Sequence, residues 1–216
     1  PDYLEDRKGN IDRTKELLEF YSGILGPYPF AREKYGHSLM ERGGGMEHQT
    51  ITTITHFNFL LVAHELIHQW FGDYVTCATW QDIWVNEGFA SYTEYLGEEF
   101  LHDQVSADVW MKNAHNYIFS EQGGSVYVPE EHKDNESRIF DYRLTYKKGA
   151  AIVHQIRFEL NNDSIFFKTL RNFLSEYADS AATGEDFREV LENTSGKDFS
   201  DFFEQWYYGE GHPVIS

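Results

Sequence analysis

The chain has 216 residues, which is long enough for one well-buried domain or for one domain with two lobes. Its net charge of −18 offers no basic stripe to neutralise phosphates, so nucleic acid and anionic membrane surfaces are disfavoured as partners. An apolar fraction of 41% is typical of a globular protein, and no stretch approaches the ~18 apolar residues of a membrane span. We therefore expect a soluble protein without a transmembrane segment.

The start of the chain and its cysteine content leave the compartment open. Pro1 is not an initiator methionine, which is typical of a fragment or a processed form, and no signal peptide is recognisable. Cys77 is the single cysteine, so an internal disulfide is excluded. Its apolar neighbours from Tyr74 to Ala78 predict a loop or strand with a buried, inert thiol.

The first 55 residues predict a helix followed by a small sheet. Asn10 or Asp12 can cap a helix that runs to about Ile24. Its inner side carries Leu17, Leu18, Phe20 and Tyr21. Residues 38–42 and 48–54 are expected to be strands, because threonine and isoleucine favour extended structure.

A glycine-rich turn leads into the second of these strands. Gly43, Gly44 and Gly45 permit positive φ angles or a close approach of the backbone to another group. Glu47 follows them, and composition alone favours a solvent-facing charge at this position.

The next segment contains a His-Glu-x-x-His pattern in a helical context. His64 and His68 are four residues apart, so on a helix both imidazoles share one face and can reach one metal ion. Glu65 lies beside that face, where it can take a proton from a water molecule at the metal. The surrounding run, residues 57–71, is apolar at helical spacing and ends at Gly72. The plainer alternative is two core-facing histidines and a surface glutamate.

A zinc site needs a third protein ligand, and Glu87 is the candidate. Eighteen residues separate it from His68, which allows one helix to end and a second, from Ile83 to about Phe100, to return. Two histidines and one glutamate leave a fourth position open, as in catalytic zinc sites. Glu94, seven residues further on, is a candidate partner for the outer nitrogen of a ligand histidine, with Ser91 as a rival.

The remainder of the chain predicts helices. Residues 102–124 are expected to form a helix and loop, and 125–141 a long polar connection that can border a cleft. Thr145 can cap a helix over residues 146–160. Three amphipathic helices are expected at 164–179, 184–193 and 198–208, with a capping box at Thr183 and Asp186 and stops at Gly196 and Gly209.

Four motifs carry a family resemblance through their order and spacing. They are Gly44-Gly45-Met46-Glu47-His48, Val62-Ala63-His64-Glu65-Leu66-Ile67-His68-Gln69-Trp70-Phe71-Gly72-Asp73, Trp84-Val85-Asn86-Glu87-Gly88-Phe89-Ala90 and Tyr146-Lys147-Lys148-Gly149-Ala150. From about Asp12 to the C-terminus, the chain resembles the catalytic domain of the aminopeptidase N family of zinc peptidases (gluzincins), which also contains leukotriene hydrolase.

The resemblance implies a mostly helical α+β fold of the thermolysin-like type. We expect a single metallopeptidase catalytic domain over residues 1–216. Within it, a helix and mixed-sheet lobe would occupy about 1–55, the zinc-binding helices 56–101 and a helical lobe 102–216. The β-rich domain that precedes this region in the family, and the domains that follow it, are expected to be absent from this chain.

The resemblance also implies roles for individual residues. Glu47 would bind the free α-ammonium group of the substrate, with Gly44, Gly45 and Met46 beside it. Tyr146 would stabilise the oxyanion, and Tyr142 is its local rival. His48 stands where the commonest family form has asparagine, and the effect of that change stays open.

These observations predict a zinc-dependent aminopeptidase that hydrolyses N-terminal residues from peptides with a free N-terminus. One zinc ion would be held by His64, His68 and Glu87, with Glu65 as the base. A thermolysin-like endopeptidase is one alternative, and Glu47 and Tyr146 argue against it. A non-catalytic metal-binding interaction module is another, and the retained Glu65 argues against that. The preferred N-terminal residue, the oligomeric state and the activity without flanking domains stay open.

Overall fold

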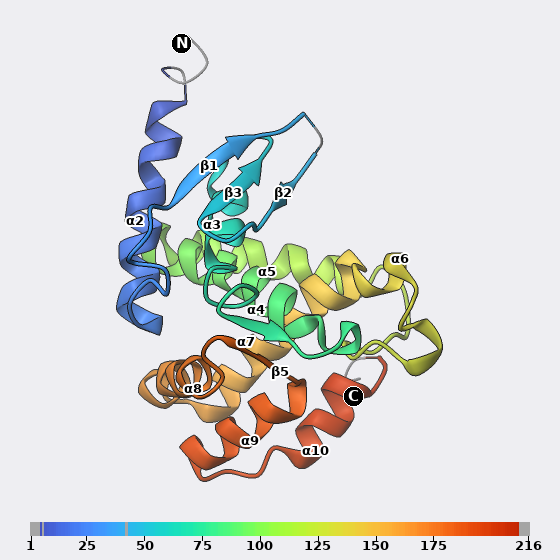
Figure 1. The fold of residues 1–216 in the computed structure, drawn as a ribbon. Coiled ribbons are helices and arrows are strands. Elements are labelled where there is room, and N and C mark those ends of the chain that lie inside the picture. The colour runs from blue at the N-terminus through green and yellow to red at the C-terminus, as the bar shows by residue number, and fades with distance from the viewer. Residues whose placement is uncertain (1–4, 6, 42, 212–216) are drawn as a thin grey trace.

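The fold of residues 5, 7–41 and 43–211 is known from a computed structural model and is mostly helical, with two small sheets. Figure 1 shows the larger sheet and helix α2 on one side and the later helices on the other, with α3 and α4 between them. The predicted α+β class, with a small sheet lobe, two central helices and a helical lobe, is confirmed.

The sheet lobe consists of one long helix and three short strands. The elements are α2 (Lys8–Leu25), β1 (Gly36–Leu39), β2 (Gly45–Met46) and β3 (Ile51–Ile54). Strand β3 lies in the middle, parallel to β1 and antiparallel to β2. The edge strand β2 therefore has one side unpaired within this sheet.

Three details of this lobe differ from the prediction. Helix α2 begins after Arg7 with no side-chain cap, so the predicted caps Asn10 and Asp12 lie inside it. The first predicted strand starts earlier and ends at Leu39, while Arg42 at its predicted end lies outside the described residues. The glycine-rich turn itself contributes β2.

Two central helices carry the histidine and glutamate motifs. They are α3 (Phe59–Ile67) and α4 (Trp84–Gly97), joined through β4 (Val75–Cys77) and the short 3₁₀ helix η1 (Trp80–Asp82). The Asn58 side chain caps α3 by accepting a hydrogen bond from the Leu61 amide at 2.7 Å. The first helix is shorter than the predicted apolar run, because His68 is the C-cap of α3. The second agrees with the prediction of a helix from Ile83 to about Phe100, since α4 continues as the π-helical segment η2 (Glu98–His102).

The helical lobe forms the rest of the chain. Its elements are α5 (Gln104–Ile118), η3 (Glu130–His132), α6 (Glu136–Ile139), η4 (Tyr142–Lys148), α7 (Gly149–Leu160), α8 (Asp163–Glu176), β5 (Ser180–Ala182), α9 (Gly184–Ser195), α10 (Ser200–Phe202) and η5 (Phe203–Tyr208). Strand β5 was not predicted, and it pairs with β4 in parallel. The capping box of Thr183 and Asp186 is confirmed, and Gly196 ends α9 with φ of 69°.

The predicted cap at Thr145 is wrong. Asp141 caps the π-helical segment η4 instead, by accepting a hydrogen bond from the Leu144 amide, while the Thr145 hydroxyl donates to the Ile139 carbonyl. Tyr146 therefore lies within a helix and not at its first turn. An aspartate at the cap position competes with threonine because its carboxylate also interacts with the helix dipole.

The core is built around α4, in which every residue is buried. The Trp84 indole, at the start of α4, is fully buried and donates a hydrogen bond to the Gly149 carbonyl at 3.1 Å. A Cβ atom on Gly149 would lie 2.6 Å from the Trp84 ring and 3.1 Å from the Gly88 Cα. These two glycines therefore let the start of α7 touch α4, which sets the position of η4 beside the motif helices.

Of the helices in the described ranges, none combines the length and the apolar character that a bilayer-spanning segment requires.

Candidate metal centre and active site

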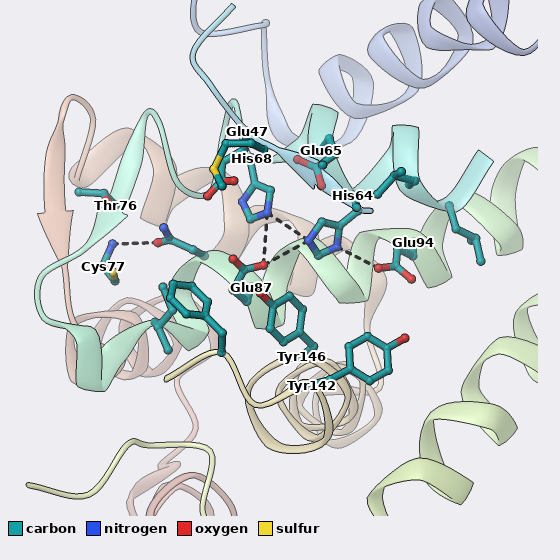
Figure 2. A pocket seen from close by; sticks show the side chains of 18 of the residues that line it. Glu47, His64, Glu65, His68, Thr76, Cys77, Glu87, Glu94, Tyr142 and Tyr146 are labelled. Atoms are coloured by element: carbon teal, nitrogen blue, oxygen red, sulfur yellow. Dashed lines mark hydrogen bonds and ion pairs between the residues drawn. The ribbon is translucent and has the colours of Figure 1, made fainter. Parts of the chain in front are cut away.

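Three side-chain atoms from the two central helices converge on one point. The His64 Nε2 atom lies 3.2 Å from both His68 Nε2 and Glu87 Oε2, and the His68 Nε2 atom lies 3.3 Å from Glu87 Oε2 (Figure 2). Ligands of a tetrahedral zinc ion, each about 2.0–2.1 Å from the metal, lie roughly 3.3 Å from one another. The triangle therefore has the size of three corners of a zinc site, with the fourth corner open.

No other group of three or more histidine, cysteine or acidic side chains gathers in this way within residues 5, 7–41 and 43–211. The chemistry of the donors also fits, because two imidazoles and one carboxylate are the usual ligands of catalytic zinc. Both His68 and Glu87 are buried, so the donors are held in a low-dielectric environment.

The outer nitrogen of each histidine has a hydrogen-bond acceptor. His64 Nδ1 donates to Glu94 Oε1 at 2.9 Å, and His68 Nδ1 donates to the Phe71 carbonyl at 2.9 Å. These bonds fix a proton on Nδ1, so in the neutral imidazole the Nε2 lone pair faces the triangle. The prediction that Glu94 accepts from a ligand histidine is confirmed, and its rival Ser91 makes no such contact.

The three ligands influence one another's protonation. Burial opposes protonation of His68, but the Glu87 carboxylate outweighs it and raises the pKa of His68 to about 10. Burial likewise opposes protonation of His64, and hydrogen bonds to Glu87 and Glu94 raise its pKa to about 9. Burial alone would raise the pKa of Glu87, yet the two imidazoles hold it well below its usual range. The negative charge of Glu87 therefore favours a positive charge beside it, either a protonated imidazole or a metal ion.

Glu94 is itself enclosed. Its second oxygen accepts hydrogen bonds from Trp110 Nε1 at 2.9 Å and from Lys147 Nζ at 3.2 Å. Burial would raise the pKa of the Glu94 carboxyl, but Lys147 and His64 lower it below its usual value. The carboxylate therefore stays ionised.

The Glu65 carboxylate lies next to the triangle and has an unused acceptor. Its Oε2 atom is buried without a hydrogen-bond partner among the described residues, which is costly for a polar atom unless water or substrate binds there. Burial raises the pKa of Glu65 to about 7, although His68 and His64 oppose the shift. A carboxylate with a pKa near neutrality is suited to accept and return a proton.

Gly45 makes room for Glu65. A Cβ atom on Gly45 would overlap the Glu65 carboxyl group, so β2 can cross the motif helix at this distance only with glycine there. Gly44 beside it has φ of 93°, a left-handed conformation that favours glycine. Both uses predicted for the glycine run, positive φ and close approach, are confirmed.

A cavity of about 1160 Å³ opens onto these groups, and all nine predicted site residues line it. They are Gly44, Gly45, Met46, Glu47, His64, Glu65, His68, Glu87 and Tyr146. Glu136 and Phe140 line it as well, so the long connection does border the cleft as predicted. Cys77 also lines it and is half-buried, not fully buried; burial raises its pKa to about 11, as expected of an unreactive thiol.

Tyr146 faces the triangle from the helical lobe. Its ring stacks 5.9 Å from the His64 ring, at an interplanar angle of 18°. Burial, followed by the charges of Glu87 and Glu47, raises the Tyr146 pKa far above its usual range, so the phenol remains a hydrogen-bond donor. Its rival Tyr142 lies further out, on the Glu94 side of the centre, and is exposed (Figure 2).

Sequence reasoning missed three supports of the site. Trp110 could not be predicted from sequence spacing, because it lies on a different helix from its partner Glu94. The Phe71 carbonyl could not be predicted either, because it is a backbone group that any residue would provide. Lys147 lies in a quoted motif, but that motif does not reveal its distant partner Glu94.

Two helices that present two histidines and a glutamate, with a second glutamate and a tyrosine facing them, define the site as one of the metallopeptidase type. The chain matches the Peptidase family M1 domain over residues 10–206 and belongs to that family.

Related proteins and structures agree with this assignment. The chain is 29% identical to aminopeptidase N of Lactococcus lactis subsp. lactis, over 94% of this chain and 26% of that protein. It is 31% identical to tricorn protease-interacting factor F2 of Thermoplasma volcanium, over 98% and 30% of the two chains. The structure of a mutant M1 zinc metallopeptidase from Deinococcus radiodurans, bound to a Tyr-Ser-Ala substrate, superposes with a TM-score of 0.81 at 26% identity, over 93% of this chain and 45% of that one.

Proposed function

We propose that the chain is the catalytic part of a zinc-dependent aminopeptidase that removes N-terminal residues from peptides. The observation that carries the proposal is the ligand triangle of 3.2–3.3 Å with the unpartnered Glu65 oxygen beside it. The chain spans 26–30% of the length of the first curated relatives, and the proposal extends their activity to this part. The same proposal takes residues 1–216 as one metallopeptidase catalytic domain.

His64, His68 and Glu87 are the proposed ligands of one zinc ion. When bound, zinc supplies Lewis-acid chemistry by polarising the scissile carbonyl and by lowering the pKa of a water molecule. The hydrogen bonds to Glu94 and to the Phe71 carbonyl hold the two imidazoles in the tautomer that binds metal.

Glu65 is the proposed general base and acid. Its free Oε2 atom accepts the proton of the attacking water and later passes it to the leaving amine. Its raised pKa, about 7, lets one carboxyl group perform both transfers near neutral pH.

Tyr146 is the proposed donor to the oxyanion that develops on the carbonyl oxygen. Its phenol is protonated at any ordinary pH and is therefore available as a hydrogen-bond donor. Tyr142 is the less suitable donor because it is half exposed to solvent.

Glu47 is the proposed anchor for the free amine of the substrate. It lies on the sheet side of the cavity, next to Met46 and across the metal triangle from Tyr146 (Figure 2). Gly45 and Met46 form the edge strand β2 beside it, and Gly44 precedes them. All three are proposed to contact the substrate backbone. An anchored amine would limit cleavage to the first peptide bond, in agreement with the names of the aminopeptidase relatives.

The experiment that tests the function compares one peptide with its N-acetylated twin. Each is incubated with the zinc-loaded protein and followed by mass spectrometry. Stepwise loss of N-terminal residues from the free peptide alone is the expected result. Cleavage of both peptides at internal bonds would replace the proposal with an endopeptidase. Zinc binding without cleavage of either would favour a non-catalytic module, or a chain that requires flanking domains, and the longer natural chain would separate those two.

A Glu47→Gln variant extends this test to the amine anchor. We expect a higher KM for the free peptide, because the variant removes the charge that pairs with the ammonium group. Glu136→Gln is the matched control, since Glu136 is another carboxylate of the cavity wall but has no proposed contact with the amine. Equal KM values in the two variants would contradict the role of Glu47.

A further inference from the structure

We propose that Lys147 is a positioning residue that fixes Glu94 and, through Glu94, the orientation of the His64 metal ligand. Trp110 shares this role. The inference rests on the metal site proposed above, but it does not depend on peptidase activity.

The contacts form one continuous chain from the ligand triangle into the helical lobe. His64 Nδ1 bonds to Glu94 Oε1 at 2.9 Å, and Glu94 Oε2 accepts from Trp110 Nε1 at 2.9 Å and from Lys147 Nζ at 3.2 Å. All four residues are buried or nearly so, and the side chains of Lys147 and Glu94 are only 8% and 11% exposed. Little solvent is present to screen or replace these bonds.

The two oxygens of Glu94 have separate tasks. One faces the ligand histidine, while the other is held by two donors from different elements, α5 and η4. A carboxylate held at one end cannot rotate freely at the other, so the direction of the Oε1 lone pair toward His64 is set. His68 has no carboxylate partner of this kind, because its outer nitrogen donates to the Phe71 backbone carbonyl.

Lys147 is itself fixed by aromatic rings. Its Nζ atom lies 4.4 Å from the Trp110 ring centroid and 4.9 Å from that of Tyr142, which are favourable distances for a cation over a ring. The Tyr142 ring lies 5.8 Å from the ring of Tyr146. Lys147 therefore joins the Glu94 side of the metal centre to the segment that carries Tyr146, its neighbour in sequence.

Lys148 provides a matched control on the same helical segment. It is also a buried lysine, but its Nζ atom donates to the backbone carbonyls of Gly124 and Gly209. Neither carbonyl belongs to the proposed metal centre. A general effect of removing a buried lysine from η4 should therefore appear in both variants, whereas an effect on the metal should appear only at Lys147.

The test measures zinc affinity by competition with a chromophoric chelator and records the visible spectrum of the cobalt-substituted protein. Removing an outer partner of a metal ligand typically weakens metal binding by about 10–100-fold. Lys147→Met, one step further out, is expected to weaken zinc binding about tenfold, at the low end of that range, and to alter the cobalt spectrum. Lys148→Met is expected to leave both unchanged, even if it lowers thermal stability.

A double-mutant cycle tests whether the effect passes through Glu94. In a Glu94→Gln background, Lys147→Met is expected to cause little further loss of zinc affinity. Full additivity of the two losses would overturn the proposal. Trp110→Phe keeps an aromatic ring at this position but removes the indole N–H donor, so it tests the same carboxylate if Lys147→Met does not fold. The proposal would also be overturned if the variants that fold bind zinc as tightly as the unmutated chain and show its cobalt spectrum. If the unmutated chain binds no zinc, the metal site itself would be overturned.

Discussion

The two walls of the cavity are built in different ways. The helical wall, formed by α3, α4 and η4, holds the metal ligands in a buried network in which each outer histidine nitrogen has a partner. The sheet wall is the two-residue edge strand β2, which pairs only with β3 in its sheet. It approaches the helical wall through a position without a side chain, Gly45, which lies over Glu65.

This difference separates two tasks. A metal site requires atoms fixed to a fraction of an ångström, and buried side chains with several partners provide that. A peptide substrate must enter and leave, and a short strand edge with free backbone groups can bind it without being buried. Changes to the buried ligand network of the helical wall should therefore affect metal binding and stability. Changes to the sheet wall, and to the Glu65 and Tyr146 side chains that face the substrate, should affect turnover with the metal retained.

The largest effect is expected at the point where the walls meet. Glu65→Gln removes the proton acceptor but keeps the size of the side chain, so we expect peptide hydrolysis to fall by about 10²–10⁴-fold. Zinc content should be unchanged, because Glu65 is not one of the three converging ligands. Near-normal turnover by the zinc-loaded variant would contradict the role of Glu65.

Tyr146→Phe removes one donor from the helical wall. Loss of an oxyanion donor typically costs about 10²–10³-fold in kcat. We expect the fall in kcat with little change in KM, since the phenol acts on charge that develops after binding. Tyr142→Phe is the control, and a larger loss there would identify Tyr142 as the donor instead.

Gly45→Ala should create a steric clash between strand β2 and helix α3. The added methyl group would overlap the Glu65 carboxyl group, and a displacement of about 1 Å at a reacting group can cost about 10²-fold in rate. Gly43→Ala is the matched control, because a Cβ there meets nothing within 4 Å. Equal kinetics for the two variants would show that β2 does not approach Glu65 closely.

The helical wall can be tested through stability. Gly149→Ala would press a methyl group against Trp84 and Gly88, and overpacking of this kind costs about 1–3 kcal/mol. Gly23→Ala, in an uncrowded position of α2, should instead stabilise the fold by roughly 0.5–1 kcal/mol. Urea unfolding of the two variants measures this contrast, which would be lost if α7 did not touch α4 at Gly149.

The smallest expected effect is the release of protons from the histidine ligands when zinc binds. The folded-state pKa of His68, about 10, lies above the usual value of 6.5, so its protonated form stabilises the metal-free protein below pH 6.5, and that stabilisation is lost as the pH rises through 10. Zinc requires the neutral imidazole, so its binding at pH 7 should release protons. Calorimetry in buffers of different ionisation enthalpy would detect the release, and a binding enthalpy independent of buffer would contradict it.

The sequence predicts the helical wall better than the sheet wall. Ligand spacing on a helix is a local property, so His64, His68 and their shared face follow from the four-residue interval. Strand β5 and the contact between Gly45 and Glu65 depend on segments far apart in the chain, which no local pattern encodes.

Competition between neighbouring residues limits the prediction of helix starts. Thr145 and Asp141 are both good caps, and only the tertiary structure, in which the Thr145 hydroxyl turns to the Ile139 carbonyl, selects Asp141. The same applies to Glu94. Its spacing from Glu87 places it on the correct face, but its partners Trp110 and Lys147 come from later elements of the chain.

Metal content measures the central claim most directly. Purified wild-type chain, Glu65→Gln and Glu87→Ala are dialysed against a weak chelator and analysed for zinc per chain by native mass spectrometry. We predict one zinc ion in the first two and none in Glu87→Ala, because that variant removes a corner of the triangle. A wild-type chain without zinc, or a Glu87→Ala variant that retains a full equivalent, would contradict the account.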